Sequence, residues 1–149
     1  MASAPSALVL EPRPAVSVVL ASQSENDRLS LRMICGFYGF SLYEAGSCRE
    51  AVALAGRHHV PVVICERDLP GGGWKAVLEG LAGLPQCPRL IVSSRMADLY
   101  LWADVLDLGG YDVLITPFDV KEVARVVSLA RRSVKREESH AAAASATAG

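Results

Sequence analysis

The sequence predicts an α/β domain in which a five-stranded parallel sheet carries helices on both of its faces. Five short apolar runs alternate along the chain with five segments of helical periodicity. The runs are apolar throughout, which is typical of strands that are covered on both faces. One helical segment lies in each connection, as crossovers between parallel strands require. The chain has 149 residues, which suits one open, doubly wound sheet and is too few for a barrel of eight strand–helix units.

The five expected strands are short, and the first of them is a β-branched run. They cover residues 16–20, 40–44, 61–65, 90–93 and 113–115. Between the third strand and the third helix, the LPGGG segment at 69–73 can only form a turn. Because GGG lacks the spacing of known phosphate-binding loops, we interpret it as a flexible turn rather than a phosphate cradle.

Capping residues mark where the helices begin. Ser24 with Asp27 approximates a capping box, and Ser47 with Glu50 forms a full S-x-x-E box. The fourth helix is expected from residue 98 to 108 and the last after Asp119. In the first helix, the apolar residues at helical spacing that we expect to form its stripe are Leu29, Met33, Ile34 and Phe37.

Composition and charge exclude several classes of protein. With 15 basic and 16 acidic residues, the net charge is −1, so no nucleic-acid-binding surface is expected. No apolar run reaches the roughly 18 residues of a membrane span. The four cysteines form no CxxC pair, and His58 and His59 are adjacent at the end of a helix, so we expect no zinc site. The pattern indicates no disulfides and a cytoplasmic location.

The two ends of the chain differ in composition from the middle. Residues 1–14 are rich in Ala, Ser and Pro without a signal-peptide pattern, and residues 136–149 are charged and then rich in Ala. Neither segment has large apolar groups to bury, so we expect both to be flexible and the folded domain to span residues 15–135. We expect no DNA-binding domain after residue 136.

Two motifs and the order of elements resemble the response-regulator receiver family over residues 16–132. The motifs are VVICERDLPGGGW at 62–74 and GGYDVLITPFDVKEV at 109–123. The resemblance implies a flavodoxin-like, CheY-like sheet in the order 2-1-3-4-5 with five flanking helices. It also implies a cis peptide bond between Thr116 and Pro117, and a functional rim at the carboxyl ends of the strands.

The chain departs from the receiver pattern at most of the positions that carry phosphoryl chemistry. By position, the acidic pair that holds Mg²⁺ in receivers falls on Ser22 and Gln23, the phosphoacceptor Asp on Glu66, the hydroxyl on Ser93, the Lys on Thr116, and the aromatic switch residue on Val113. Mg²⁺ prefers hard oxygen ligands that include carboxylates, and phosphoryl transfer requires neutralised charge. We therefore expect no metal, no cofactor and no catalysis at this site.

The hypothesis that follows is a degenerate receiver: a non-catalytic signalling module that acts by protein–protein interaction without phosphorylation. One alternative is a residually active phosphoacceptor of a two-component phosphorelay, using Glu66 or Asp68. Another is a sensor that binds a small ligand at the vacated rim. Glu66 itself is interpreted either as a solvated carboxylate or as a phosphomimic, Asp68 as a turn residue or a shifted acceptor, and Arg67 as a solvated or anion-binding side chain.

The fourth helix carries more apolar residues than one buried stripe can hold. The residues that can share an inward stripe are Leu101, Trp102, Val105 and Leu108. Because Leu99, Tyr100 and Leu106 then cannot all face inward, they are candidate anchors for a contact surface. In receivers, the face formed by the fourth helix, fifth strand and fifth helix often binds partners. We expect a protein partner or a homodimer there, over Leu99, Tyr100, Trp102, Leu106 and Val113; the alternative is a rotated helix that buries most of these residues.

Overall fold

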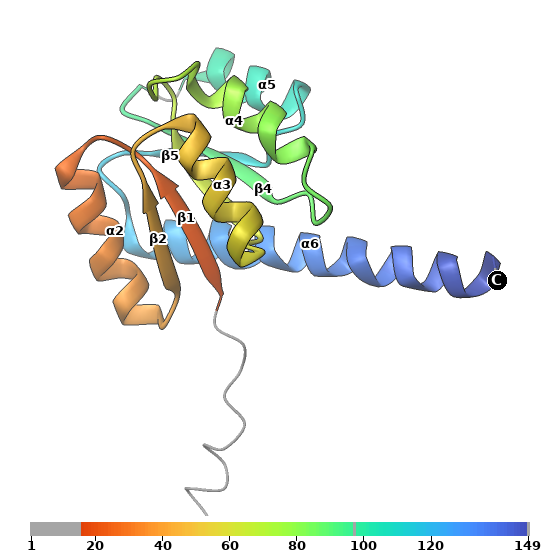
Figure 1. The fold of residues 1–149 in the computed structure, drawn as a ribbon. Coiled ribbons are helices and arrows are strands. Elements are labelled where there is room, and N and C mark those ends of the chain that lie inside the picture. The colour runs from red at the N-terminus through yellow and green to blue at the C-terminus, as the bar shows by residue number, and fades with distance from the viewer. Residues whose placement is uncertain (1–15, 97, 149) are drawn as a thin grey trace, which may run out of the picture.

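A five-stranded parallel sheet in the order β2-β1-β3-β4-β5 forms the centre of the computed structural model, which describes residues 16–96 and 98–148 (Figure 1). The strands are β1 (Ser17–Ala21), β2 (Ser41–Ala45), β3 (Val62–Glu66), β4 (Arg89–Ser94) and β5 (Asp112–Ile115). All four pairings are parallel. The predicted fold class and strand order are confirmed. The N-terminal segment 1–14, expected to be flexible, lies outside the described residues.

Five helices of the described chain cover the two faces of the sheet. They are α2 (Glu25–Tyr38), α3 (Cys48–His58), α4 (Gly73–Ala82), α5 (Leu99–Asp107) and α6 (Val120–Ala148). Helices α3, α4 and α5 pack over one hydrophobic cluster, which includes Val63 and Val92 of the sheet. Helices α2 and α6 pack over the other, which includes Leu20 and Ile64. Alternate residues of the same strands thus enter opposite cores.

Four of the five described helices begin directly after a capping side chain, as the sequence indicated at Ser24, Ser47 and Asp119. The side chains of Ser24, Ser47, Asp98 and Asp119 each accept a hydrogen bond from the backbone N–H three residues later, at 2.9–3.2 Å. Each bond satisfies a donor that the first turn of a helix leaves free, which stabilises the helix by roughly 1 kcal/mol. The caps fix where each helix starts relative to the end of the preceding strand.

The apolar stripe that we expected on α2 differs from the one that is buried. Leu31, Ile34 and Cys35 face the core, whereas Met33 and Phe37 are 77% and 79% exposed. The sequence of α2 contains two overlapping apolar stripes at helical spacing, so periodicity alone cannot select between them. The buried stripe is the one that packs with the sheet and α6 in a shared cluster.

Helix α6 extends past residue 135, the expected end of the folded domain. It continues to Ala148, well beyond the sheet, as Figure 1 shows, and the expected flexibility of residues 136–149 stays a prediction. Alanine has the highest helix propensity, and neither Gly nor Pro interrupts the chain before Gly149. Arg89 of β4 fixes the part of α6 that leaves the sheet, because its guanidinium donates to Ser133 Oγ at 2.6 Å and to Glu137 at 2.7 Å. No helix of the described residues is both long enough and apolar enough to cross a membrane.

Two leucines of α2 provide a matched test of the observed helix rotation. Leu31 is fully buried and Leu29 is 48% exposed, two residues apart on the same helix. We expect Leu31→Ala to lower the free energy of unfolding by about 3 kcal/mol, because it leaves a cavity, and Leu29→Ala to lower it by less than about 1 kcal/mol. Urea denaturation measures both, and equal losses would contradict the observed rotation.

Candidate functional site

The carboxyl ends of four strands bring the predicted site residues to one rim of the sheet. Ser22 follows β1, Glu66 ends β3, Ser93 lies near the end of β4, and Thr116 follows β5. Glu66 is paired with Ser93 across the sheet. The structure thus places together residues up to 94 positions apart in the sequence (116 minus 22). The Thr116–Pro117 peptide bond is cis, as the receiver resemblance implied.

The carboxylate of Glu66 is bound by the loop that follows β1. Ser22 Oγ donates to Glu66 Oε1 at 3.0 Å, and the backbone N–H of Gln23 donates to Oε2 at 3.3 Å. Ser22 is fully buried, and its Oγ also accepts from the backbone N–H of Ser24 at 3.0 Å. Glu66 is half-buried. Its two oxygens are therefore held by neutral donors, which distinguishes it from a freely solvated carboxylate.

This set of donors does not fit a resident Mg²⁺. At the positions that are acidic in receivers, Ser22 presents a hydroxyl already bonded to Glu66 and Gln23 presents an amide. Within residues 16–96 and 98–148, no group of three His, Cys, Asp or Glu side chains could hold a metal. One carboxylate with both oxygens engaged is too little charge for a hard divalent cation.

A cavity of about 490 Å³ opens at the same rim. It is lined by Ser24, Asp27, Glu66, Arg67, Asp68, Ser93, Ser94, Arg95, Met96, Asp98 and Thr116. Partial burial raises the pKa of Asp27, and the negative charge of Glu66 adds to this, while Arg95 opposes it. The sequence singled out Asp27 only as part of a capping box, and Arg95 not at all. The signal for Asp27 as a site residue was its place in the first turn of the helix that follows a central strand.

Asp68 lies on the surface beside the cavity. Its side chain is 82% exposed and accepts from Arg67 Nε at 3.3 Å, so each neutralises the other. The GGG turn that follows is a backbone requirement: all three glycines have positive φ, and a Cβ on Gly73 would lie 2.9 Å from the carbonyl oxygen of Arg67. The turn lets α4 begin directly behind the rim.

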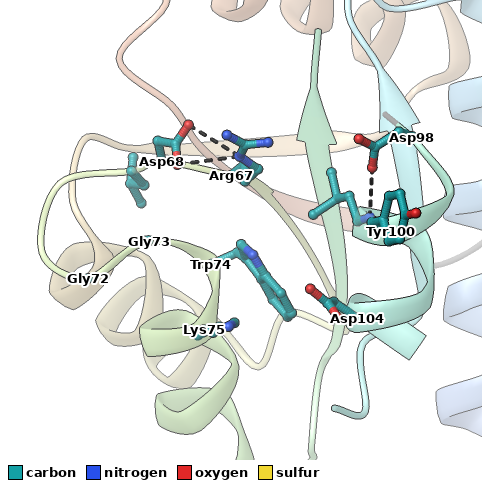
Figure 2. A pocket seen from close by; sticks show the side chains of 11 residues that line it. Arg67, Asp68, Gly72, Gly73, Trp74, Lys75, Asp98, Tyr100 and Asp104 are labelled. Carbon is teal, nitrogen blue, oxygen red and sulfur yellow. Dashed lines mark hydrogen bonds and ion pairs between the residues drawn. The ribbon is translucent and has the colours of Figure 1, made fainter. Parts of the chain in front are cut away.

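A second cavity, of about 570 Å³, lies between the start of α4 and the start of α5 (Figure 2). Trp74 is buried at its base, with the ammonium of Lys75 5.7 Å from the ring centroid. Arg67, Asp98 and Asp104 contribute charges to its walls. The sequence analysis did not find this cavity, because its lining residues come from separate segments without a common motif.

The outer surface of α5 exposes the residues predicted as anchors. Leu99 and Tyr100 are 80% and 83% exposed, and Leu106 is 37% exposed. Trp102 and Leu108, which we placed in the inward stripe, are about half-exposed, so the prediction was wrong for these two. Leu101 and Val105 alone are buried from this helix. An apolar groove of about 760 Å³ results, lined by Leu99, Tyr100, Trp102, Val113 and Ile115 with Asp98 and Asp112.

Comparisons with known proteins agree with this architecture. No protein-family model matches the chain. The transcriptional regulatory protein MalR of Bacillus subtilis is 27% identical over 113 residues, covering 75% of this chain and 48% of MalR. The regulatory protein AtoC of Escherichia coli is 27% identical over 126 residues, covering 83% of this chain and 27% of AtoC. The chain therefore spans about half the length of one of these relatives and about a quarter of the other.

Solved receiver domains share the fold of this chain. The signal receiver domain of an HD domain-containing protein from Pseudomonas fluorescens superposes with a TM-score of 0.76. The two are 21% identical, over 87% of this chain and 96% of that one. The chain thus has the CheY-like receiver fold.

The hydroxyl of Ser22 provides a direct test of the rim's internal hydrogen bonds. We expect Ser22→Ala to lower the free energy of unfolding by about 1–3 kcal/mol, because Glu66 loses one donor and the Ser24 N–H loses its acceptor. Urea denaturation of Ser22→Ala and of the exposed control Ser41→Ala makes the comparison. A loss no larger than that of the control would contradict the role given to Ser22.

Proposed function

We propose that this domain is a degenerate receiver: a non-catalytic signalling module of the cytoplasm that acts by binding a protein partner, without a phosphorylation cycle. The observation that carries the proposal is the pair of hydrogen bonds that Ser22 and Gln23 donate to Glu66. In receivers, the positions of Ser22 and Gln23 carry the acidic pair that binds Mg²⁺, and the position of Glu66 carries the phosphoacceptor Asp. Here the same positions satisfy one another within the folded chain.

The charges at the rim support the loss of phosphoryl transfer. A transferred phosphoryl group requires positive charge on its oxygens and a correctly placed nucleophile. Thr116 supplies a neutral hydroxyl where receivers have Lys, and the Glu66 side chain is one methylene longer than Asp. A displacement of about 1 Å is enough to weaken such chemistry greatly. Asp68, the alternative acceptor, is exposed and paired with Arg67.

A fixed carboxylate at this rim also supports the phosphomimic interpretation of Glu66. Its oxygens accept two hydrogen bonds from the β1–α2 loop, and its charge stands at the strand end where receivers are phosphorylated. A permanent charge of this kind favours one state of the domain rather than a switch between two. The partner surface would then be constitutively available.

The groove on α5 and β5 is the proposed partner surface. Its floor and walls are apolar side chains, with Asp98 and Asp112 among its lining residues. A partner segment with an apolar anchor and flanking basic residues matches this chemistry. A homodimer is the alternative, but the same face meeting itself about a two-fold axis would bring these carboxylates toward their own copies.

Phosphorylation chemistry supplies the first test of the proposal. Incubation with acetyl phosphate and millimolar Mg²⁺ is expected to leave the intact mass of the protein unchanged, because neither a metal cluster nor a Lys is present at the rim. The quadruple variant Ser22→Asp, Gln23→Asp, Glu66→Asp, Thr116→Lys serves as the positive control, and we expect it to bind Mg²⁺ detectably. A phosphoryl adduct on the natural chain that is lost in Asp68→Asn would instead support the phosphorelay alternative.

Introduction of a negative charge on the exposed face of α5 supplies the second test. We expect Leu99→Glu, in the groove, and Leu106→Glu, on the same helix outside the groove lining, to abolish partner capture or dimerisation, since each places a carboxylate in the proposed apolar contact. Light scattering and pull-down measure the effect, and circular dichroism checks that the variants fold. Met33→Glu, an equally exposed apolar site on α2, is the matched control. Normal assembly of both α5 variants would place the interface elsewhere.

A further inference from the structure

Two buried hydroxyls face the rim cavity without a protein partner. Ser93 and Thr116 are 3% and 6% exposed, and both line the cavity. Among the described residues, no hydrogen bond involves either side-chain oxygen, and no fully enclosed side-chain N or O is left without a partner. The small exposed part of each residue must therefore include its hydroxyl, which opens into the cavity. Both hydroxyls are therefore free to accept hydrogen bonds from a ligand that enters the cavity.

The charges around the cavity identify the sign of that ligand. Arg67 is paired with Asp68, which leaves Arg95 against three carboxylates, those of Asp27, Glu66 and Asp98. Glu66 and Asp98 accept hydrogen bonds from neutral donors only, so their charges are not neutralised. Asp27 forms no ion pair among the described residues; burial and the charge of Glu66 raise its pKa, and the charge of Arg95 opposes this rise. The net charge of the lining therefore favours a cation.

From this geometry we infer that the rim cavity binds a small organic cation, an alkylammonium or guanidinium compound. Its N–H groups would donate to the Asp27 carboxylate and to the hydroxyls of Ser93 and Thr116. These acceptors do not suit a metal ion, since no metal-binding cluster exists within the described chain. The volume of about 490 Å³ falls in the range of small-molecule sites. Such a site shares Asp98 with the partner groove and lies where receivers carry out their magnesium and phosphoryl chemistry.

Agmatine, which carries a guanidinium and an ammonium group, is a suitable probe. Titration followed by amide chemical shifts is expected to give saturable changes at residues 22–28, 66–68, 93–96 and 116. We expect Asp27→Asn to weaken binding about tenfold, because it removes a charged acceptor and leaves the backbone N–H that bonds to Ser24. The double variant Ser93→Ala, Thr116→Val tests the hydroxyls, with a similar loss expected.

Controls separate a built site from general attraction to acidic side chains. Asp107→Asn makes the same charge change on an exposed residue that does not line the cavity, and it should alter the dissociation constant by less than about twofold. Neutral 1,4-butanediol should not bind. Tighter binding of inorganic phosphate than of agmatine, or agmatine shifts unaffected by Asp27→Asn, would overturn the inference. Because this titration does not use the α5 groove, its failure leaves the partner-binding proposal standing.

Discussion

Burial of the central strands on both faces is the constraint on which the rest of the structure depends. Val18, Val19 and Leu20 of β1 and Val62, Val63 and Ile64 of β3 have no exposed surface, and they enter both hydrophobic clusters. Polar groups cannot be accommodated along these strands without a hydrogen-bonding partner. Because all five strands are parallel, their carboxyl ends meet at one edge, and polar side chains that leave the central strands gather there.

The side chains at that edge balance one another through hydrogen bonds within the chain. A magnesium-binding cluster neutralises several carboxylates with a metal, whereas Glu66 is satisfied here by a buried hydroxyl and a backbone N–H. The longer side chain of Glu66 reaches from β3 to the loop after β1, so two central strands are joined through their ends. At this rim, the carboxylate of Glu66 accepts its hydrogen bonds from the chain itself, whereas the hydroxyls of Ser93 and Thr116 face the cavity.

Local patterns in the sequence predict the elements well, and tertiary choices account for the errors. Apolar runs predict the strands, and the caps at Ser24, Ser47 and Asp119 predict three of the helix starts, because both depend on neighbouring residues only. The rotation of α2 depends on packing against distant elements. The helical conformation of residues 136–148 follows from local helix propensity, which an argument from apolar burial alone does not consider. At the site, motif spacing predicts which residues meet, but side-chain direction decided the Ser22–Glu66 bond and the positions of Asp27 and Arg95.

Asp98 connects the two proposed functions of the domain. It caps α5 through its bond to the Leu101 N–H at 2.9 Å, and it lines both the rim cavity and the apolar groove. A cation in the rim cavity would draw on the same carboxylate that stabilises the first turn of α5, and an N-cap bond is worth roughly 1 kcal/mol. Leu99 and Tyr100 lie in that first turn and line the groove. A ligand in the rim cavity would therefore act on the partner surface through Asp98. This link does not need the aromatic switch residue that receivers carry at the position of Val113.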